Sequence, residues 1–483
     1  MRLFRLAAGA TLCASAAHAQ LPQAEYAQHR AAFAARIDSG VVVAFGERNP
    51  VADFGPFFQL PAFLYLTNYR EADAAYVMIV RGGQATSWLF VTPQDPRRAF
   101  YSGRRPDSTT VARTLGLTAR PVAQLAATLD SLVGTGLPFW TLSDVASADF
   151  ARADSITRGQ LAMRALAAAR PGLQVKDAHP VLNLVRAKKS PAELALLKKA
   201  AEISSEGHRA VMAAPEAKWE YEIKATMENA FTRLGAARPA YGSIIGAGAN
   251  GTQLHYMLDR GPVKRGDLVV MDAAAEYEGY AADVTRTIPN AGKFTADQRK
   301  LYQLVRDAQA AAERNSKPGM NATAAQDSSE VVRTRGLAAL GLVESDTATF
   351  DPPWRVDCAR APRQCKQSML WMIHGISHGI GLEVHDPAQF YDTDRTFKLG
   401  DAFTIEPGIY ISTKSLEALP DTPKNRAFIA KVKGAVARYE NSGIRIEDSY
   451  IITEKGLERV SFAPREIPEI EALMAKRAPV VVP

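Results

Sequence analysis

The chain has 483 residues, of which 47% are hydrophobic and 23% are charged, with a formal net charge of +7. This composition excludes an intrinsically disordered chain, and the length predicts two or three domains because one domain commonly takes ~150 residues. Lysines and arginines do not gather into long runs, so the modest positive charge does not indicate nucleic-acid binding.

Residues 1–19 have the pattern of a signal peptide. Arg2 and Arg5 precede an apolar stretch over residues 6–17, and Ala17-His18-Ala19 is a small-x-small cleavage site. No later segment reaches ~18 uninterrupted apolar residues, which a membrane span would need. We expect an exported protein, periplasmic or secreted, that is soluble and does not enter the membrane. An N-terminal amphipathic helix of a cytoplasmic protein is the weaker alternative, because the segment has no acidic residue.

Loss of the signal peptide would leave two cysteines, Cys358 and Cys365, in a segment with the composition of a loop. In an oxidising compartment two cysteines seven positions apart can close a small loop, so we expect a structural disulfide. The alternative, a thiolate metal site, lacks a nearby CxxC or histidine partner at suitable spacing.

Residues 20–184 form the first predicted domain. An apolar run over 39–45 predicts a buried strand, and two apolar runs within 75–91, separated by Arg81-Gly82-Gly83, predict a hairpin. Spaced apolar residues over 151–169 predict an amphipathic helix. This pattern is typical of an α/β domain, and it holds no catalytic constellation.

Residues 185–483 form the second predicted domain, which begins with helices. Ser190-Pro191-Ala192-Glu193 is a capping box with proline at the first helical position, so a helix should run from here to about residue 212. The glycine-rich segment over 243–251 lacks the spacing and the following helix of a dinucleotide fingerprint. The other predictions are helices over 221–234 and 295–315, an irregular region through the two cysteines, and a strand-rich remainder.

A predicted hairpin over residues 270–286 lies at the centre of this second domain, with Asp272 and Asp283 near the inner ends of its arms. Two carboxylates that face one another repel unless a cation sits between them, because both cannot stay ionised in a low-dielectric site. A divalent metal would meet that need. Alternatively, both aspartates are solvated turn residues, which is the commoner situation for an arbitrary pair.

Three histidines lie within twelve positions, at His374, His378 and His385, among glycines that let the backbone approach closely. Further on, Glu406 and Glu447 each follow apolar strand residues, where an unpaired charge is expensive to bury. Together with the two aspartates these glutamates need a shared cation.

The order of these motifs resembles the pita-bread metallopeptidases, and within them the Xaa-Pro aminopeptidases. The resemblance depends on four motifs in this order: Asp272 and Asp283 with ten residues between them, Ser377-His378, Glu406-Pro407-Gly408 and Ile444-Arg445-Ile446-Glu447-Asp448. Weaker similarities reach the first domain at Tyr65-Leu66-Thr67, so the likeness covers nearly all of the chain after the signal peptide. It implies an α+β fold: a pita-bread catalytic domain preceded by an α/β creatinase-like N-terminal domain.

The resemblance also implies a site with two divalent metal ions and a bridging hydroxide. Oxygen-rich ligands suit Mn²⁺ best, with Zn²⁺ or Co²⁺ as alternatives. Glu406 would also act as proton acceptor, and His374 and His385 would contact the scissile carbonyl and the substrate. The implied metal ligands are Asp272, Asp283, His378, Glu406 and Glu447.

Three further residues complete the expected site. The resemblance places His255 on the proline side of the pocket. Arg445 shares a strand face with Glu447 and is expected to orient a metal-ligating carboxylate near the substrate. Tyr410 is expected to hydrogen-bond a ligand aspartate. For Arg445 and Tyr410, ordinary packing is the alternative.

The expected activity is removal of the N-terminal residue from peptides with proline second. A prolidase restricted to Xaa-Pro dipeptides and a non-catalytic binding protein on the same fold are the alternatives. A homo-oligomer, dimer or tetramer, is expected. The basic stretch over residues 411–442 is interpreted as a family-variable insertion, either a lid, an oligomer contact or simply a solvated face.

Overall fold

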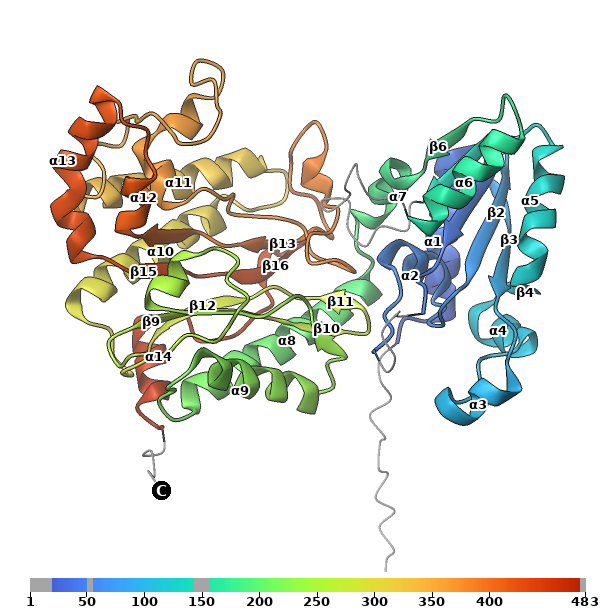
Figure 1. The fold of residues 1–483 in the computed structure, drawn as a ribbon, viewed down its shortest axis with the longest axis horizontal. Helices are drawn as coiled ribbons and strands as arrows, with labels where there is room; N and C mark the ends of the chain where they lie inside the picture. Colours follow the sequence, from blue (N-terminus) through green and yellow to red (C-terminus); the bar gives the residue numbers. More distant parts are fainter. Residues whose placement is uncertain (1–19, 50–54, 143–156, 478–483) are drawn as a thin grey trace, which may run out of the picture.

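The computed structural model describes residues 20–49, 55–142 and 157–477, which form two lobes joined by a helical linker (Figure 1). The predicted signal peptide lies outside the described residues, as does the start of the helix predicted over 151–169. The predicted domain boundary between residues 184 and 185 falls inside the helix His179–Arg186 of this linker. That boundary stays a prediction.

The N-terminal lobe is built on one six-stranded sheet with the order β4-β3-β2-β1-β5-β6. Strand β1, near the middle of the sheet, pairs antiparallel with β2 and parallel with β5, so the sheet is mixed. The predicted hairpin over 75–91 is confirmed, with Gly82 and Gly83 in the left-handed region at its turn. The strands are β1 (Gly40–Phe45), β2 (Ala75–Arg81), β3 (Gln84–Val91), β4 (Thr118–Pro121), β5 (Phe139–Leu142) and β6 (Val175–Asp177).

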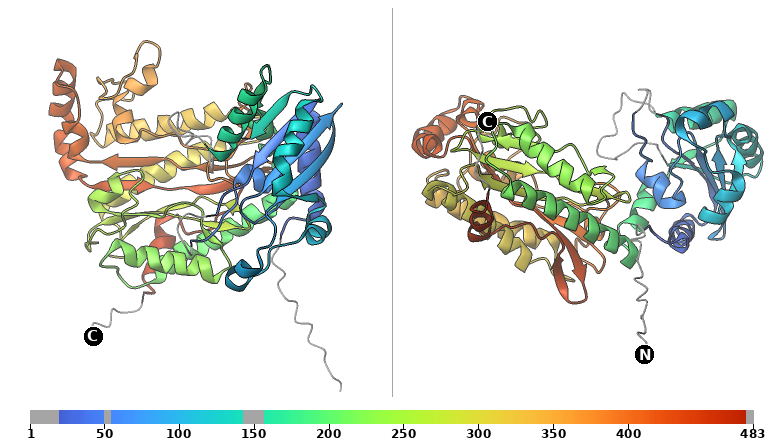
Figure 2. Two further views of the ribbon diagram at one scale, coloured as in Figure 1. Left: turned by 45° about the vertical axis from the view of Figure 1, so that its right-hand side comes forward. Right: turned by 90° about the horizontal axis from the view of Figure 1, so that it is seen from below.

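Helices cover both faces of this sheet, as an α/β domain requires (Figure 2). Val42 of β1 packs in a cluster with Phe33 of α1, whereas Val43, on the opposite face, packs with Leu129 of α5 and Met163 of α6. The helices are α1 (Gln23–Ile37), α2 (Pro61–Thr67), α3 (Pro96–Ser102), α4 (Ser108–Leu115), α5 (Leu125–Val133), α6 (Arg158–Ala169) and α7 (His179–Arg186).

The second lobe begins at the predicted capping box. The Ser190 hydroxyl accepts the Glu193 amide at 3.2 Å, and the Glu193 carboxylate accepts the Ser190 amide at 2.8 Å. The helices predicted over 190–212, 221–234 and 295–315 are confirmed as α8, α9 and α10. The helices are α8 (Pro191–Ala213), α9 (Glu220–Arg233), α10 (Ala296–Arg314), α11 (Ala322–Ala339), α12 (Thr413–Glu417), α13 (Pro423–Arg438) and α14 (Ile467–Met474). In the described part of the chain, each helix is too short or too polar to span a membrane.

Four small antiparallel sheets lie between these helices, in the orders β12-β9-β8, β11-β10-β7, β13-β16-β17 and β14-β15. Figure 1 shows the strands between α8 and α9 on one side and α10 and α11 on the other. The strands are β7 (Arg238–Pro239), β8 (Ile244–Ala247), β9 (Leu268–Asp272), β10 (Ala275–Tyr277), β11 (Tyr280–Ala281), β12 (Thr285–Pro289), β13 (Ala402–Ile405), β14 (Gly408–Ile411), β15 (Ser442–Arg445), β16 (Asp448–Thr453) and β17 (Gly456–Arg459).

The predicted central hairpin is confirmed, but it is divided between two sheets. Strand β9 pairs with β12, and Asp272 lies opposite Thr285. The strands β10 and β11 form the hairpin tip, where Glu278 and Gly279 adopt positive φ values of 51° and 91°. On both arms of the hairpin, the regular strand pairing is interrupted near Asp272 and Asp283.

The prediction of an irregular region after residue 315 is wrong for residues 322–339, which form α11. The buried face of this helix carries mainly side chains that are either small or polar, among them Ala325, Ser329 and Arg333. Gly336 lets it approach α10 closely, since a Cβ there would overlap Leu304. Such a face lacks the apolar stripe that identifies a helix in sequence. The predicted disulfide, in contrast, is confirmed: Cys358 and Cys365 are bonded, with their Cα atoms 5.8 Å apart.

The basic stretch over 411–442 contains α12 and α13. Phe428, Val432 and Val436 form the buried side of α13. Arg438 on the outer side pairs with Asp297 at 2.6 Å. The basic residues therefore belong to the solvent side of an amphipathic helix, which favours the solvated-face interpretation. A role as lid or oligomer contact stays a prediction.

Candidate metal centre

The five predicted metal ligands come from strand ends and one loop of the second lobe. Asp272 ends β9, and Asp283 lies between β11 and β12, two residues before β12 begins. The glutamates take equivalent places, one directly after β13 and the other between β15 and β16. The backbone of Glu447 bonds to that of Thr285, which joins the β15–β16 connection to the aspartate hairpin.

His378 faces the acidic residues through its Nε2 atom. This nitrogen lies 3.4 Å from Asp283 Oδ2 and 3.4 Å from Glu406 Oε1. Ligand atoms of Asp283, His378 and Glu447 lie within 4.8 Å of one another. On the far side of the ring, Nδ1 lies 3.2 Å from the carbonyl oxygen of Gly379. Since that carbonyl can only accept, Nδ1 carries the proton and Nε2 presents a lone pair to the site.

The two aspartates converge on one tyrosine that the sequence did not single out. The Tyr241 hydroxyl lies 2.7 Å from Asp272 Oδ1 and 2.5 Å from Asp283 Oδ1. A hydroxyl has one hydrogen, so it can donate to only one of these oxygens at a time. Tyr241 stands alone beside a glycine-rich segment, and no motif in the sequence would have identified it.

These buried carboxylates have too little positive charge around them to balance their own negative charge. Burial and the nearby Asp272 carboxylate raise the pKa of Asp283 to about 8. The pKa values of Glu406 and Glu447 are raised well above the usual range by burial and by neighbouring carboxylates. Thr285 donates to Glu447 Oε2 at 2.6 Å, but in the described part of the chain Glu447 Oε1 is buried without a hydrogen-bond partner.

A divalent cation fits this donor set. Buried carboxylates that crowd one another are stabilised by positive charge, and an unpartnered buried oxygen offers a free lone pair. One imidazole and several carboxylates are ligands that Mn²⁺, Zn²⁺ and Co²⁺ accept. The residues present therefore fit a metal centre.

Arg445 holds Asp272 from behind. Its Nη2 donates to Asp272 Oδ2 at 2.5 Å, and its Nη1 donates to the Tyr410 hydroxyl at 2.7 Å. The expected contact of Arg445 with a ligand carboxylate is present. The expected contact of Tyr410 with a ligand aspartate is wrong, because its hydroxyl lies between Arg445 and His374 Nε2, 2.9 Å away. Tyr241 occupies the place that was assigned to Tyr410.

The three remaining histidines differ in their surroundings. His374 has a partner at each ring nitrogen, because Nδ1 lies 2.7 Å from the Gly375 carbonyl. Burial, with the Arg445 guanidinium, lowers the pKa of His374 to about 3, so its ring is neutral at physiological pH. His385 is exposed, and its ring centroid lies 4.2 Å from that of His378. His255 is exposed. The substrate contacts of all three stay predictions.

A buried ion cluster fixes the segment that carries His385. The next residue, Asp386, forms ion pairs with Arg186 at 2.5 Å and with Lys189 at 2.7 Å. All three side chains are at most 3% exposed. Arg186 also pairs with Glu383 at 2.8 Å. These cations belong to the linker between the lobes, so the linker is tied directly to the histidine loop.

Comparisons with known proteins agree with this geometry. Residues 195–454 match the model of metallopeptidase family M24, and residues 26–137 match the aminopeptidase P N-terminal domain. The Xaa-Pro aminopeptidase of Haemophilus influenzae is 30% identical over 466 residues, which cover 94% of this chain and 98% of that protein. The Xaa-Pro aminopeptidase of Escherichia coli is 32% identical over 427 residues, covering 87% of this chain and 89% of that one.

Solved structures give the same result. Aminopeptidase P from E. coli, solved with the inhibitor Pro-Leu, matches with a TM-score of 0.77 and 28% identity over 94% of this chain and 99% of that one. Proline aminopeptidase P II from Yersinia pestis matches with a TM-score of 0.77 and 29% identity over 94% of this chain and all of that one. Fold and sequence thus agree, and the chain belongs to the Xaa-Pro aminopeptidases of metallopeptidase family M24.

Proposed function

We propose that this chain removes the N-terminal residue from peptides whose second residue is proline, with two divalent metal ions in its active site. The observation that carries the proposal is the convergence of buried carboxylates on the lone pair of His378, with Glu447 Oε1 left without a protein partner. The Xaa-Pro specificity of the relatives supports the choice of substrate.

The proposed metal ligands are Asp272, Asp283, His378, Glu406 and Glu447. Two ions held there would supply Lewis-acid chemistry, which would make a bound water a better nucleophile and polarise the peptide carbonyl. The chain keeps the site in order: Arg445 and Tyr241 fix the aspartates, Thr285 fixes Glu447, and Gly379 fixes the tautomer of His378.

Glu406 is the proposed proton carrier. Its carboxylate lies 3.4 Å from His378 Nε2, where it can accept a proton from the attacking water and pass it to the leaving amine. His374 Nδ1 lies 3.6 Å from Glu406 Oε2, so this histidine is close enough to act beside it on the scissile carbonyl. His385 is proposed to contact the substrate near the metals, and His255 to line the proline side.

Mn²⁺ is the proposed native metal, because most of the ligand atoms are carboxylate oxygens, which hard divalent ions prefer. Zn²⁺ is a reasonable substitute, and one of the matching structures is described as zinc-substituted E. coli aminopeptidase P in complex with product.

The test is turnover by chelator-stripped protein reconstituted separately with Mn²⁺, Zn²⁺ and Co²⁺. The peptide panel varies residue two between proline and alanine, and varies length from two to five residues. We expect turnover of peptides of three or more residues with proline second, highest with Mn²⁺. Turnover of dipeptides alone would establish the prolidase alternative. No turnover with any of the three metals would contradict peptidase activity and favour a binding protein.

We also propose that the protein is exported. The charge and apolar pattern of residues 1–19 and the Cys358–Cys365 disulfide support this, because disulfides persist in oxidising compartments. Cell fractionation with N-terminal sequencing of the mature chain tests it, and a mature protein that begins at Met1 in the cytoplasm would contradict it. A dimer or tetramer is the proposed assembly, to be measured by sedimentation.

A further inference from the structure

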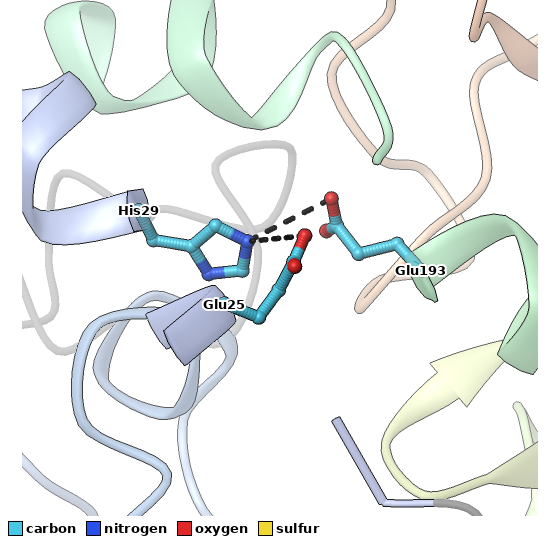
Figure 3. Close-up of side chains that lie close together, drawn as sticks. All are labelled: Glu25, His29 and Glu193. Carbon is cyan, nitrogen blue, oxygen red and sulfur yellow. Dashed lines mark ion pairs between the residues drawn. The ribbon is translucent and has the colours of Figure 1, made fainter. Parts of the chain in front are cut away.

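A second cluster of potential metal ligands lies far from the candidate metal centre in sequence, where the two lobes meet. Glu25 and His29 are one turn apart on α1 of the N-terminal lobe, and Glu193 is in the first turn of α8 (Figure 3). His29 Nε2 lies 3.9 Å from Glu25 Oε1 and 3.8 Å from Glu193 Oε2. Suitable ligand atoms of the three residues lie within 4.8 Å of one another.

The His29 ring is held so that Nε2 points into this gap (Figure 3). The side chain is buried, at 5% exposure, and its ring stacks on Tyr65 with the centroids 3.8 Å apart. Nδ1 lies 3.0 Å from the Tyr65 carbonyl, which can only accept, so Nδ1 carries the proton. The lone pair of Nε2 therefore faces the two glutamates. In the described ranges this nitrogen has no hydrogen-bond partner.

The glutamates bring negative charge without a matching cation. Glu193 accepts the Tyr280 hydroxyl at 2.9 Å and the Ser190 amide at 2.8 Å, which are both neutral donors. Among the residues that the structure describes, the Glu25 carboxylate has one ion pair, the long contact with His29. Within the described residues, no lysine or arginine nitrogen pairs with either carboxylate. Two carboxylates and an imidazole lone pair around one gap have the donor pattern of a metal site.

We propose that Glu25, His29 and Glu193 bind a divalent cation of the zinc class, which joins the N-terminal lobe to the catalytic lobe. Neighbouring ligands of a tetrahedral ion with bonds of about 2.1 Å are separated by about 3.4 Å. The distances of 3.9 and 3.8 Å from His29 Nε2 to the two glutamate oxygens would reach this value after shifts of a few tenths of an ångström. Glu25 is the most open of the three, at 14% exposure, so solvent can supply the remaining ligand from its side.

The competing explanation is a proton. A protonated His29 would place an N–H between the two glutamates and balance part of their charge without a metal. The two explanations differ in what stabilises the contact between the lobes: added zinc in the first, and low pH in the second.

The experiment uses the full chain carrying Asp283→Ala and His378→Ala, which removes two proposed catalytic ligands and lowers the background of bound metal. Chelator-stripped protein is dialysed against Zn²⁺, and bound zinc is measured by mass spectrometry, with the melting temperature recorded at pH 7.5. Adding His29→Gln to this parent is expected to remove about one zinc per chain and to abolish the zinc-dependent rise in melting temperature. Glu25→Gln, at the more open position, is expected to weaken zinc binding at least tenfold.

The matched control is His179→Gln. His179 also lies beside a carboxylate, Asp177 at 3.1 Å, but no third potential ligand is grouped with it in the described part of the chain. This variant should bind as much zinc as the parent. Equal zinc content in the parent and in both cluster variants would overturn the proposal. So would a parent protein whose melting temperature does not respond to zinc. Because bound zinc is measured and not turnover, a failure here is distinct from failure of the proposed peptidase function.

Discussion

Glu447 and Asp448 are neighbours in the chain, both are at most 1% exposed, and their surroundings are opposite. Asp448 accepts Arg286 at 2.6 Å, the Ser461 hydroxyl at 2.6 Å and Arg465 at 2.9 Å. These cations, against the effect of burial, lower its pKa to about 2. Glu447 faces other carboxylates, and its pKa is raised well above the usual range. Among the described residues, one of its oxygens has no hydrogen-bond partner.

The difference separates two uses of a buried acid. Successive residues of an extended segment point to opposite sides, so one carboxylate enters the structural core while the next enters the site. The protein supplies the counter-charge for Asp448, and on the proposed function a metal ion supplies that of Glu447. Burial alone does not distinguish a functional acid from a structural one, whereas the number of cationic partners does.

The largest expected effect is on activity. Asp283→Ala or His378→Ala should lower kcat/KM for an Xaa-Pro peptide by about 10³-fold or more in Mn²⁺-loaded protein, because charge stabilisation at the reacting carbonyl is lost. The circular dichroism spectrum should stay that of the parent. Asp177→Ala, at an exposed carboxylate, is the control and should keep full activity. Near-parental turnover in either ligand variant would refute the ligand assignment.

The second effect is on stability and distinguishes the two neighbours directly. Asp448→Asn should lower the unfolding free energy of the metal-free protein by about 3–5 kcal/mol, since Arg286 and Arg465 would lose their buried partner. Glu447→Gln should leave this free energy unchanged or raise it, because it removes a repelled charge. Urea denaturation of both variants measures the difference, and equal destabilisation would mean that the two acids have the same structural role.

The third effect concerns the tyrosine that the two aspartates share. Tyr241→Phe should weaken metal affinity or activity by about 10–100-fold, as is usual when a group that orients metal ligands is lost. Titration of the stripped protein with Mn²⁺, followed by activity, measures it. Tyr221→Phe removes a hydroxyl from a side chain that is 48% exposed and should change nothing. An unchanged metal titration for Tyr241→Phe would exclude a positioning role.

A further effect is a pH dependence of opposite sign for the two acid environments. Asp283, with a folded pKa of about 8 against an ordinary value of 3.8, binds more protons folded than unfolded between these values. Metal-free protein should therefore lose stability as pH rises from about 4 to 8, by at most about 1.4 kcal/mol per pH unit for each such group.

Asp448, with its pKa lowered to about 2, stabilises the fold above pH 3.8, and this contribution is lost as pH falls towards 2. Melting temperatures of stripped and Mn²⁺-loaded protein from pH 3 to 8.5 test both signs. Metal should flatten the decline above pH 4 and leave the acid limb in place. A metal-free curve that rises steadily to pH 8 would contradict the raised pKa of Asp283.

Much of the site was predictable because its residues stand at strand ends in a specific order. Asp272, Asp283, Glu406 and Glu447 each follow or interrupt an apolar run, where an unbalanced charge calls for a partner. Tyr241 was not predictable, since a single tyrosine carries no spacing signal and its role depends on the convergence of two strands.

The fold shows the same division. Helices with apolar stripes or capping boxes, such as α8 and α10, were located to within a residue or two. Helix α11 was missed because it buries Ser329 and Arg333 where an apolar stripe would be expected, and Arg333 finds its partner, the Ser368 carbonyl at 2.9 Å, only in the folded chain. The Glu25, His29 and Glu193 cluster was also invisible in the sequence, because it joins residues 164 positions apart that form no motif.

The ion cluster of Arg186, Lys189 and Asp386 makes the linker and the histidine loop one rigid unit. His385 is covalently next to Asp386, so rotation of the N-terminal lobe about the linker would either break two buried ion pairs or carry His385 with it. Of the proposed metal ligands, His378 belongs to the same loop as His385, whereas Asp272, Asp283, Glu406 and Glu447 lie at or beside the ends of strands. On the proposed function, in which His385 contacts the substrate, the position of that contact is thus coupled to the linker between the lobes.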